Sequence, residues 1–336
     1  MRYCQNGEAD FCASQSVSLP PDASVGIRRR THGPACAKTL ATRAQLAKEE
    51  IRIVDWMRFS APLSADEERE FAPFLHELIG HAFFVIRRFF LTGTRVHIKA
   101  DASPVTAADR KAEAELRRQI ERRYPQHGIV GEEYGERKGG RYRWILDPID
   151  GTKAFISNCF LFGTLIALER DDGEGYRPVL GCIAHAAAGC ALIGHRARTT
   201  LFTWDGVQRR VRVRAPRRLD EATVLATSVP GSREGDSDPL ALAIVQRAAL
   251  VRTWGDCFGY FALATGGADA MLDPVLSYWD VAAVVPVVEG AGGRVTNWQG
   301  GDPLRKPSLI ASSGALHEEI LALLHSASAS GPSSPP

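Results

Sequence analysis

The chain contains, near its middle, the stretch Trp144-Ile145-Leu146-Asp147-Pro148-Ile149-Asp150-Gly151-Thr152. The first three residues are apolar and favour a β-strand, which the proline is expected to end. The two carboxylates at the strand end can face one point and offer oxygen ligands suited to hard divalent cations, with the Ile149 carbonyl between them. Gly151 and Thr152 add backbone N–H groups suited to a phosphate. An Asp-Pro turn followed by a helix N-cap explains the same residues without any function, so this stretch alone leaves both interpretations open.

Other blocks of the sequence favour the functional interpretation. Trp279-Asp280 is followed, after eleven residues, by Gly292-Gly293; residues 101–109 read Asp-Ala-Ser-Pro-Val-Thr-Ala-Ala-Asp; and Gly131 precedes the doublet Glu132-Glu133. Together with D-P-I-D-G-T, these blocks resemble the signatures of the inositol monophosphatase family, and the resemblance covers residues 66 to 324. The stretches 254–257 (Trp-Gly-Asp-Cys) and 150–156 are most similar to the histidinol-phosphate phosphatase branch of that family.

The resemblance implies both a fold and a reaction. The fold is a layered α+β and α/β sandwich in which helix and sheet layers alternate (αβαβα). The reaction is the hydrolysis of a small phosphate monoester by an activated water, without a phosphoenzyme. Two or three Mg²⁺ ions per site are implied, with Mn²⁺ as an alternative, and Mg²⁺ suits an all-oxygen ligand set without His or Cys.

The resemblance also assigns site residues. It implies that the metal ligands are Glu132, Asp147, the carbonyl of Ile149, Asp150 and Asp280, and that Glu133 supports Glu132. It implies catalytic roles for Asp109, Glu132 and Thr152, with Asp109 orienting Thr152, and phosphate binding by Gly151 and Thr152. The residues implied for the leaving-group pocket are Asp256, Cys257 and Asp273.

Three of these acids have simpler structural explanations. Thr106 and Asp109 have the spacing of a helix cap, where an acid gains about 0.3–1 kcal/mol from the helix dipole. Paired glutamates on a loop are usually a solvated patch, although Glu132 and Glu133 would repel each other in one pocket unless a cation lay between them.

The identity of the leaving group depends on the charge of its pocket. Acids in its pocket suit a cation better than a neutral polyol, and histidinol carries an ammonium group and an imidazole. The alanine-rich stretch 185–190 departs from the histidinol-phosphate phosphatase branch, so phosphatase activity on inositol 1-phosphate or adenosine bisphosphate stays an alternative. A non-catalytic partner of the transcription machinery is the alternative from another class of protein.

The composition is that of a globular chain. It has 336 residues, of which 45% are hydrophobic and 24% charged, and its net charge of +2 gives no reason to expect nucleic acid or an acidic membrane as partner. The seven cysteines include no C-x-x-C pair, so neither a zinc knuckle nor a disulfide framework is expected. No apolar run approaches the length of a membrane span. We expect a cytoplasmic protein, and the resemblance implies a homodimer.

The chain divides into four expected regions. Residues 1–62 show no helical or strand period and are expected to be a disordered extension, or translation from too early a start, with an organelle-targeting segment as the less favoured alternative. Residues 63–216 form an α+β domain with the metal motif, residues 217–325 form an α/β domain, and residues 326–336 are a disordered Ser/Pro-rich tail.

Periodicity and caps predict the elements. One helix is expected to begin at the cap Ser64-Glu67, with an apolar face reaching Phe90, and a second to begin at Thr106. Three further helices are expected at residues 239–250, 258–265 and 281–291. Pro286 predicts a kink or an earlier end for the last of these. The strands expected are 128–131, 162–168, 179–183, 190–193, 199–203, 209–214, 223–227 and 251–254.

Overall fold

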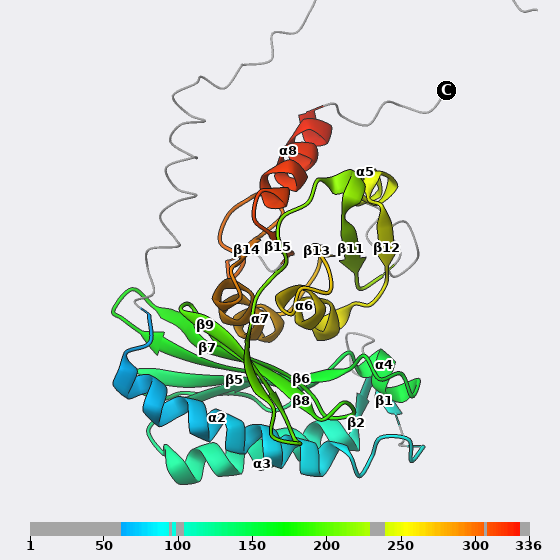
Figure 1. The fold of residues 1–336 in the computed structure, drawn as a ribbon. Helices are drawn as coiled ribbons and strands as arrows, with labels where there is room; N and C mark the ends of the chain where they lie inside the picture. Colours follow the sequence, from blue (N-terminus) through cyan, green and yellow to red (C-terminus); the bar gives the residue numbers. More distant parts are fainter. Residues whose placement is uncertain (1–61, 94–95, 99–103, 229–238, 306–307, 330–336) are drawn as a thin grey trace, which may run out of the picture. The chain divides into compact units, whose positions relative to one another are not determined.

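The computed structural model describes residues 62–93, 96–98, 104–228, 239–305 and 308–329 (Figure 1). Apart from Pro62, the expectation for residues 1–62 therefore lies outside the described residues, as does the start of the 101–109 block.

The larger sheet contains the metal motif. Its strands are β3 (Gly128–Gly131), β4 (Gly135–Arg137), β5 (Tyr142–Asp150), β6 (Gly163–Asp171), β7 (Tyr176–His185), β8 (Cys190–His195), β9 (Arg198–Thr203) and β10 (Gln208–Val211). They lie in the order β10-β9-β8-β7-β6-β5-β3-β4. β3 and β5 are parallel, and the other neighbours are antiparallel. The strands expected between residues 162 and 214 are present as β6 to β10, and each pairs antiparallel with the next.

Pro148 does not end its strand, which corrects one expectation. β5 continues to Asp150, and its pairing with β6 shifts register between Asp147 and Asp150. Proline has no N–H to give to the ladder, and a local irregularity accommodates it. The irregularity lies between the two carboxylates of the motif.

Two capped helices cover one face of this sheet, α2 (Ala65–Ile86) and α3 (Ala107–Arg123). Both predicted capping boxes are present, from Ser64 with Glu67 and from Thr106 with Asp109. α2 ends earlier than its apolar pattern suggested, because Phe90 follows the helix in a turn. Its ring nevertheless packs on Phe162, with centroids 4.7 Å apart. A separate two-stranded sheet, β1 (Val96–Ile98) with β2 (Pro104–Thr106), precedes α3.

The smaller sheet belongs to the second half of the chain. Its strands are β11 (Thr223–Ala226), β12 (Leu250–Arg252), β13 (Ala270–Asp273), β14 (Gly293–Thr296) and β15 (Leu309–Ser313). Their order is β12-β11-β13-β15-β14, with β11 parallel to β12 and β13, and β15 antiparallel to its two neighbours. The strand predictions reached the first two of these strands and missed the last three.

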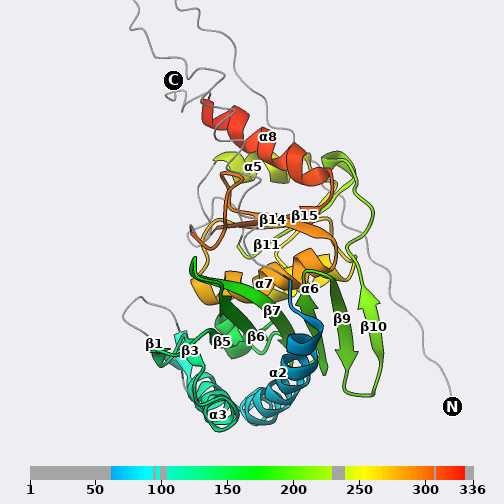
Figure 2. The ribbon, with the colours of Figure 1, turned by 90° about the vertical axis from the view of Figure 1, so that its left-hand side faces the viewer.

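Two helices lie between the sheets, α6 (Asp256–Ala264) and α7 (Tyr278–Gly290) (Figures 1 and 2). α7 packs closely on the larger sheet because two glycines of that sheet face the helix. A Cβ on Gly181 would lie 2.2 Å from the Ala283 carbonyl oxygen, and one on Gly194 would lie 2.4 Å from the Val287 Cα. The helix begins at Tyr278, before the predicted start at 281, and it continues past Pro286.

The outer layer on the far side of the smaller sheet is α5 (Pro239–Arg247) with α8 (Leu316–Ala329). A 3-10 turn, η2 (Leu219–Glu221), and the short helix α4 (Thr152–Ile156) are the remaining elements in the described part of the chain. The predicted αβαβα layering is confirmed. Residues 326–329, expected in the tail, belong to α8. The change of sheet near residue 217 agrees with the proposed domain boundary, but α7 joins both sheets in one core, so that boundary stays a prediction.

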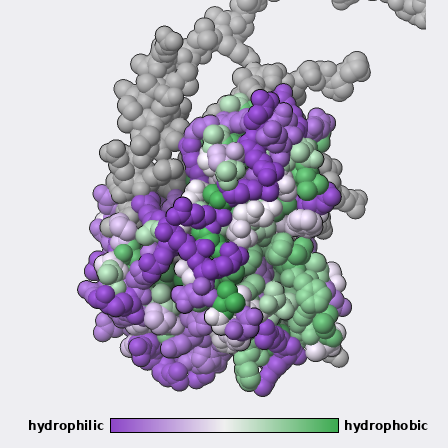
Figure 3. Space-filling view, in the orientation of Figure 1, coloured by the Kyte–Doolittle hydropathy of each residue, from purple (hydrophilic) through white to green (hydrophobic). Residues whose placement is uncertain are grey.

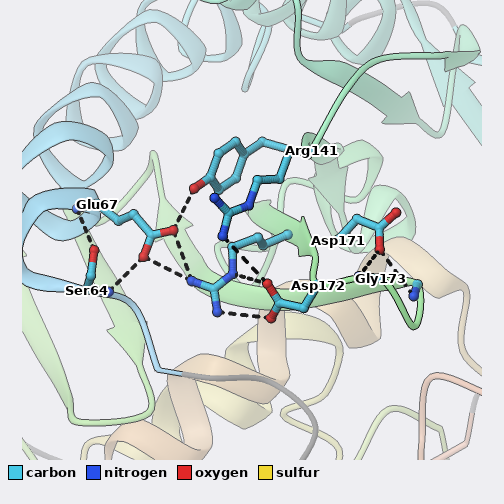
Figure 4. Close-up of polar contacts among 9 residues, drawn as sticks. Ser64, Glu67, Arg141, Asp171, Asp172 and Gly173 are labelled. Carbon is cyan, nitrogen blue, oxygen red and sulfur yellow. Dashed lines mark hydrogen bonds and ion pairs between the residues drawn. The ribbon is translucent and has the colours of Figure 1, made fainter.

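An ion network around the buried side chain of Arg170 joins α2 to the larger sheet (Figure 4). The guanidinium of Arg170 on β6 donates to both carboxylate oxygens of Glu67, at 2.9 and 3.0 Å, and also binds Asp172. Tyr142 donates a further bond of 2.6 Å to Glu67. Burial alone would raise the pKa of Glu67, but these bonds and the one from the Ser64 N–H outweigh it and lower the pKa to about 2. Glu67, which completes the capping box of α2, therefore also fastens the helix to the sheet.

Candidate active site

Three carboxylates converge where β5 ends and α7 begins. Asp147, Asp150 and Asp280 each bring one oxygen to a group whose members all lie within 4.8 Å of one another. Asp280 is the third residue of α7 and not its N-cap, and its Oδ2 accepts the N–H of Ser277 at 2.8 Å. Asp150 accepts the N–H of Cys257 at the start of α6. The cluster is thus assembled from both halves of the chain.

The clustered acids repel one another in a partly buried site. Burial raises the pKa of Asp147 well above 3.8, and the charges of Glu132 and Asp150 raise it further. Burial likewise raises the pKa of Asp150 and of Asp280 to about 7, and the repulsion of neighbouring acids adds to it. A group of close carboxylates with raised pKa values favours a bound cation, which would balance their charge.

The turn after β5 brings the remaining groups of the motif beside the cluster. The Ile149 N–H donates to Asp147 Oδ1 at 3.1 Å, and the Thr152 hydroxyl donates to the Ile149 carbonyl at 3.1 Å. Gly151 adopts a left-handed φ of 77° as the N-cap of α4, a conformation that glycine reaches without strain. A Cβ there would lie 2.9 Å from the Asp256 Oδ2, so this turn borders the expected leaving-group pocket.

Asp109 has the structural role that its spacing suggested. Its Oδ2 accepts the Thr106 N–H at 2.8 Å and the Thr106 hydroxyl at 2.6 Å. Burial raises its pKa, the bonds from Thr106 oppose the rise, and the charge of Glu132 adds to it. No hydrogen bond joins Asp109 to Thr152 among the described residues, and the orienting role expected for Asp109 stays a prediction.

Glu132 and Glu133 lie in the turn between β3 and β4. Glu132 is outside the group of three carboxylates, and its charge acts on Asp147. The Glu133 side chain is 4% exposed and lies 3.9 Å from the Arg110 guanidinium on α3. The N–H of Glu133 donates to Glu113, a buried acid that sequence reasoning missed, although it stands four residues after Asp109 and hence on the same face of α3.

A small cavity of about 140 Å³ adjoins the cluster. Asp150 and Asp280 line it together with Asp256 and Cys257, the two residues implied for the leaving-group pocket, and the polar residues Thr227 and Tyr260, which were not predicted, also line it. Asp256 adopts a left-handed φ of 49°, and its N–H donates to the Thr227 hydroxyl at 2.9 Å. Burial raises the pKa of Asp256 to about 7, the charge of Asp150 adds to it, and Lys153 opposes it.

Asp273 takes a different place from the one expected. It is 2% exposed and does not line this cavity. Its Oδ2 accepts the Tyr260 hydroxyl at 2.6 Å, and Thr227 also hydrogen-bonds to its carboxylate. Asp273 therefore supports two residues that line the cavity, and direct contact with a leaving group stays a prediction.

The stretch that departs from the family branch lies near this pocket. His185 is buried, its Nδ1 lies 2.9 Å from the Phe162 carbonyl, and its ring packs on Phe258 and Phe261 of α6. Burial lowers its pKa to about 4, so the ring is neutral at neutral pH. At this departure from the family branch, the His185 ring thus adds volume behind α6 without adding charge.

A larger groove of about 1070 Å³ lies between α2 and strands β8 to β10. Its lining shares no residue with the carboxylate cluster, so its size does not make it the catalytic site.

The donor set fits divalent cations. Buried carboxylates with raised pKa values, a nearby backbone carbonyl and a further glutamate provide the hard oxygen ligands that Mg²⁺ and Mn²⁺ prefer. An αβαβα sandwich with such a cluster at a strand end, beside a D-P-I-D-G-T turn, defines a metal-dependent phosphatase that acts on small phosphorylated substrates.

The comparisons give the family. The model of the inositol monophosphatase family matches residues 67–329, and the chain belongs to this family. A histidinol-phosphatase of Chlorobaculum parvum is 34% identical over 232 residues, which cover 68% of this chain and 86% of that protein. The bifunctional phosphatase IMPL2, chloroplastic, of Arabidopsis thaliana is 36% identical over 299 residues, with 88% and 79% covered.

A solved structure agrees with this assignment. An inositol monophosphatase from Zymomonas mobilis has a TM-score of 0.67 and 35% identity, covering 78% of this chain and 99% of that one. The chain is accordingly a phosphoric monoester hydrolase of this family. Within its described part, the structure has no helix whose length and hydropathy would let it cross a membrane.

Proposed function

We propose that this phosphatase releases phosphate from L-histidinol phosphate with Mg²⁺ as its cation, a step of histidine biosynthesis. The observation that supports it most is the half-buried carboxylate of Asp256 in the cavity beside the cluster. A desolvated acid recognises a cationic leaving group more strongly than a neutral one. The similarity to a protein named histidinol-phosphatase points the same way.

The chain's own groups have separate tasks in the proposed reaction. Bound Mg²⁺ would neutralise phosphate charge and make water more acidic. Asp147, Asp150, Asp280, Glu132 and the Ile149 carbonyl would hold it. The N–H groups of Gly151 and Thr152 would bind phosphate oxygens, and Glu132 with Asp109 and Thr152 would orient the attacking water. No serine or cysteine nucleophile is needed, so no phosphoenzyme should accumulate.

One assay distinguishes the candidate substrates. Phosphate release is measured with Mg²⁺ from histidinol phosphate, inositol 1-phosphate and adenosine 3′,5′-bisphosphate side by side. The proposal requires the highest kcat/KM on histidinol phosphate. An equal or higher value on inositol 1-phosphate would favour that activity instead, in keeping with the similarity to an inositol monophosphatase structure.

A non-catalytic partner of the transcription machinery is the alternative from another class. Asp147→Asn tests it, because removing the most buried acid of the cluster should abolish hydrolysis while leaving the surface unchanged. Loss of the biological role in this variant supports the enzyme, and an unchanged role supports the binding partner.

We further propose a homodimer, with the hydrophobic surface over α4 as the contact. Figure 3 shows hydrophobic residues gathered there, and Leu91 and Phe160 are both 59% exposed. Exposed apolar patches often mark protein interfaces. Light scattering on Phe160→Glu should show a monomer, whereas the wild type should be a dimer.

We place the enzyme in the cytoplasm, where a reducing environment suits its four described cysteines, which are all free. Because one relative is named chloroplastic, imaging of a fluorescent fusion of the full chain tests this location.

A further inference from the structure

The turn that presents Glu132 is a tight hairpin. Gly131 at the end of β3 pairs with Gly135 at the start of β4, which leaves Glu132, Glu133 and Tyr134 as the three turn residues. Gly135 adopts a left-handed φ of 66°, as three-residue hairpin turns require. The Glu132 N–H still donates to the Leu146 carbonyl of β5, at 3.2 Å. Glu132 therefore leaves the sheet at the level of the carboxylate motif.

One buried carboxylate holds the rest of this turn. Glu113 of α3 is fully buried, its Oε2 accepts the Glu133 N–H at 2.7 Å, and its Oε1 accepts the Tyr134 N–H at 3.2 Å. The two backbone donors that follow Glu132 thus share one acceptor group. Bonds from N–H groups to an ionised carboxylate are stronger than bonds between neutral groups.

The charge of Glu113 is balanced within the same assembly. The Arg117 Nε donates to Glu113 Oε1 at 2.7 Å, and Arg117 Nη2 donates to the Gly135 carbonyl. The guanidinium also lies 5.9 Å from the centroid of the Tyr134 ring. Arg117 therefore closes the turn from its far end while holding the Glu113 carboxylate in place.

Gly131 is the complementary half of this arrangement. A Cβ at this position would lie 2.0 Å from Glu113 Oε1 and 2.4 Å from its Cδ. Only a residue without a side chain lets the carboxylate come close enough to reach the N–H groups beyond it.

We propose that Glu113 is a positioning residue for the cation site, which fixes the Glu133–Tyr134 backbone and thereby holds the Glu132 carboxylate toward Asp147. The proposal rests on the proposed role of Glu132 as a cation ligand. Asp109 and Glu113 lie one turn apart on α3, so one helix face supplies both a group at the site and the anchor of the opposing loop. Glu113 touches neither substrate nor cation, and its effect is exerted through Glu132.

The test is Glu113→Gln, measured as Mn²⁺ binding by calorimetry and by electron paramagnetic resonance, without substrate. Glutamine keeps one acceptor oxygen but places an NH₂ group where the second N–H needs an acceptor. Mn²⁺ affinity should fall about 10- to 100-fold, as when partners of metal ligands are changed. The matched control is Glu115→Gln on the same helix, whose carboxylate binds Arg118 and Gln119, and its Mn²⁺ affinity should stay within twofold of wild type.

A kinetic readout separates positioning from a loss of fold. Raising the Mg²⁺ concentration should restore most of the kcat of Glu113→Gln, because a displaced ligand weakens cation binding without removing it. A merely structural role would lower kcat at every Mg²⁺ concentration and leave the Mn²⁺ affinity of the folded fraction unchanged, and that result would overturn the proposal.

Gly131→Ala gives an independent route that does not alter Glu113. The added methyl group should push the carboxylate or the turn aside and lower Mn²⁺ affinity to a similar extent. In a Glu113→Ala background the same change should have little further effect, because the clash is gone. Additive effects of the two changes would contradict the proposed contact. If the Glu113 variants prove too unstable to study, the Mn²⁺ affinity of Gly131→Ala alone still tests the proposal, because this variant keeps Glu113, and an unchanged affinity would overturn it.

The outcomes for the two proposals can be told apart. If Glu113→Gln loses Mn²⁺ affinity but the wild type does not hydrolyse histidinol phosphate, the substrate proposal fails and the positioning role stands. If the wild type hydrolyses it and Glu113→Gln binds Mn²⁺ normally, the reverse holds.

Discussion

Removing one clustered carboxylate should stabilise the protein in the absence of divalent cations and at high pH. The change is Asp150→Asn, which preserves size and one oxygen. Burial, with the added charge of Asp280, raises the pKa of Asp150 from 3.8 to about 7. Ionising this group in the folded protein therefore costs about 4 kcal/mol more than in the unfolded chain.

The sign of the pH dependence follows from that pKa. The folded state binds more protons than the unfolded chain between pH 3.8 and about 7, so the free energy of unfolding falls as the pH rises through this range. From about pH 5.5 to about pH 8 the loss from Asp150 alone is about 2 kcal/mol. Buried histidines act in the opposite direction, since burial lowers the pKa of His185, for example, to about 4. The quantity to compare is therefore the difference between variant and wild type.

Urea denaturation followed by tryptophan fluorescence, with EDTA present, measures this difference. Asp150→Asn should gain about 2 kcal/mol on the wild type between the two pH values. Saturating Mg²⁺ should reverse the order, because binding to the folded state stabilises the protein that has all three carboxylates.

Asp205→Asn, at an exposed position, is the control and should show no such pH-dependent difference. A variant-to-wild-type difference that does not change with pH, or equal stabilisation of both proteins by Mg²⁺, would refute the reasoning.

Three further changes test the pocket and the fold. Asp256→Asn should raise KM for histidinol phosphate about tenfold and leave KM for inositol 1-phosphate nearly unchanged, since a charge-assisted bond is lost only with the cationic substrate. An equal rise in KM for both substrates would show that Asp256 does not distinguish a cationic from a neutral leaving group. Tyr260→Phe should reproduce the effect of Asp273→Asn, with non-additive changes in kcat/KM for the pair, whereas a large effect of Asp273→Asn alone would mean that its carboxylate contacts substrate directly. Glu67→Gln should lower the free energy of unfolding by about 2 kcal/mol in urea, because the buried guanidinium of Arg170 loses one of its two anionic partners; a loss below about 0.5 kcal/mol would mean that Asp172 alone satisfies the guanidinium.

Local signals predicted local structure well. The caps at Ser64 and Thr106 need only residues three positions away, and both formed as predicted. The alternating strands of the larger sheet were readable for the same reason. β13 to β15 were missed because they are short and buried, and their small residues give no clear alternation.

The site depended on information that local patterns do not contain. Asp147 and Asp280 are distant in sequence, and family resemblance, not periodicity, brought them together. The burial of Asp273 against Tyr260 and the hold of Glu113 on the hairpin turn both arise from neighbours supplied by other elements. Such contacts depend on how the layers stack, which single-sequence patterns do not show.

The enclosure of α7 between two sheets has a consequence for hydrogen exchange. Its amides should be among the slowest to exchange with solvent, because opening them requires separating the sheets. The β3–β4 hairpin lies at the edge of the larger sheet and should open far more often. Asp280 thus lies on a helix whose amides should exchange slowly, and Glu132 lies on a hairpin that should open more often. Brief local openings should therefore release bound cations from the Glu132 side first.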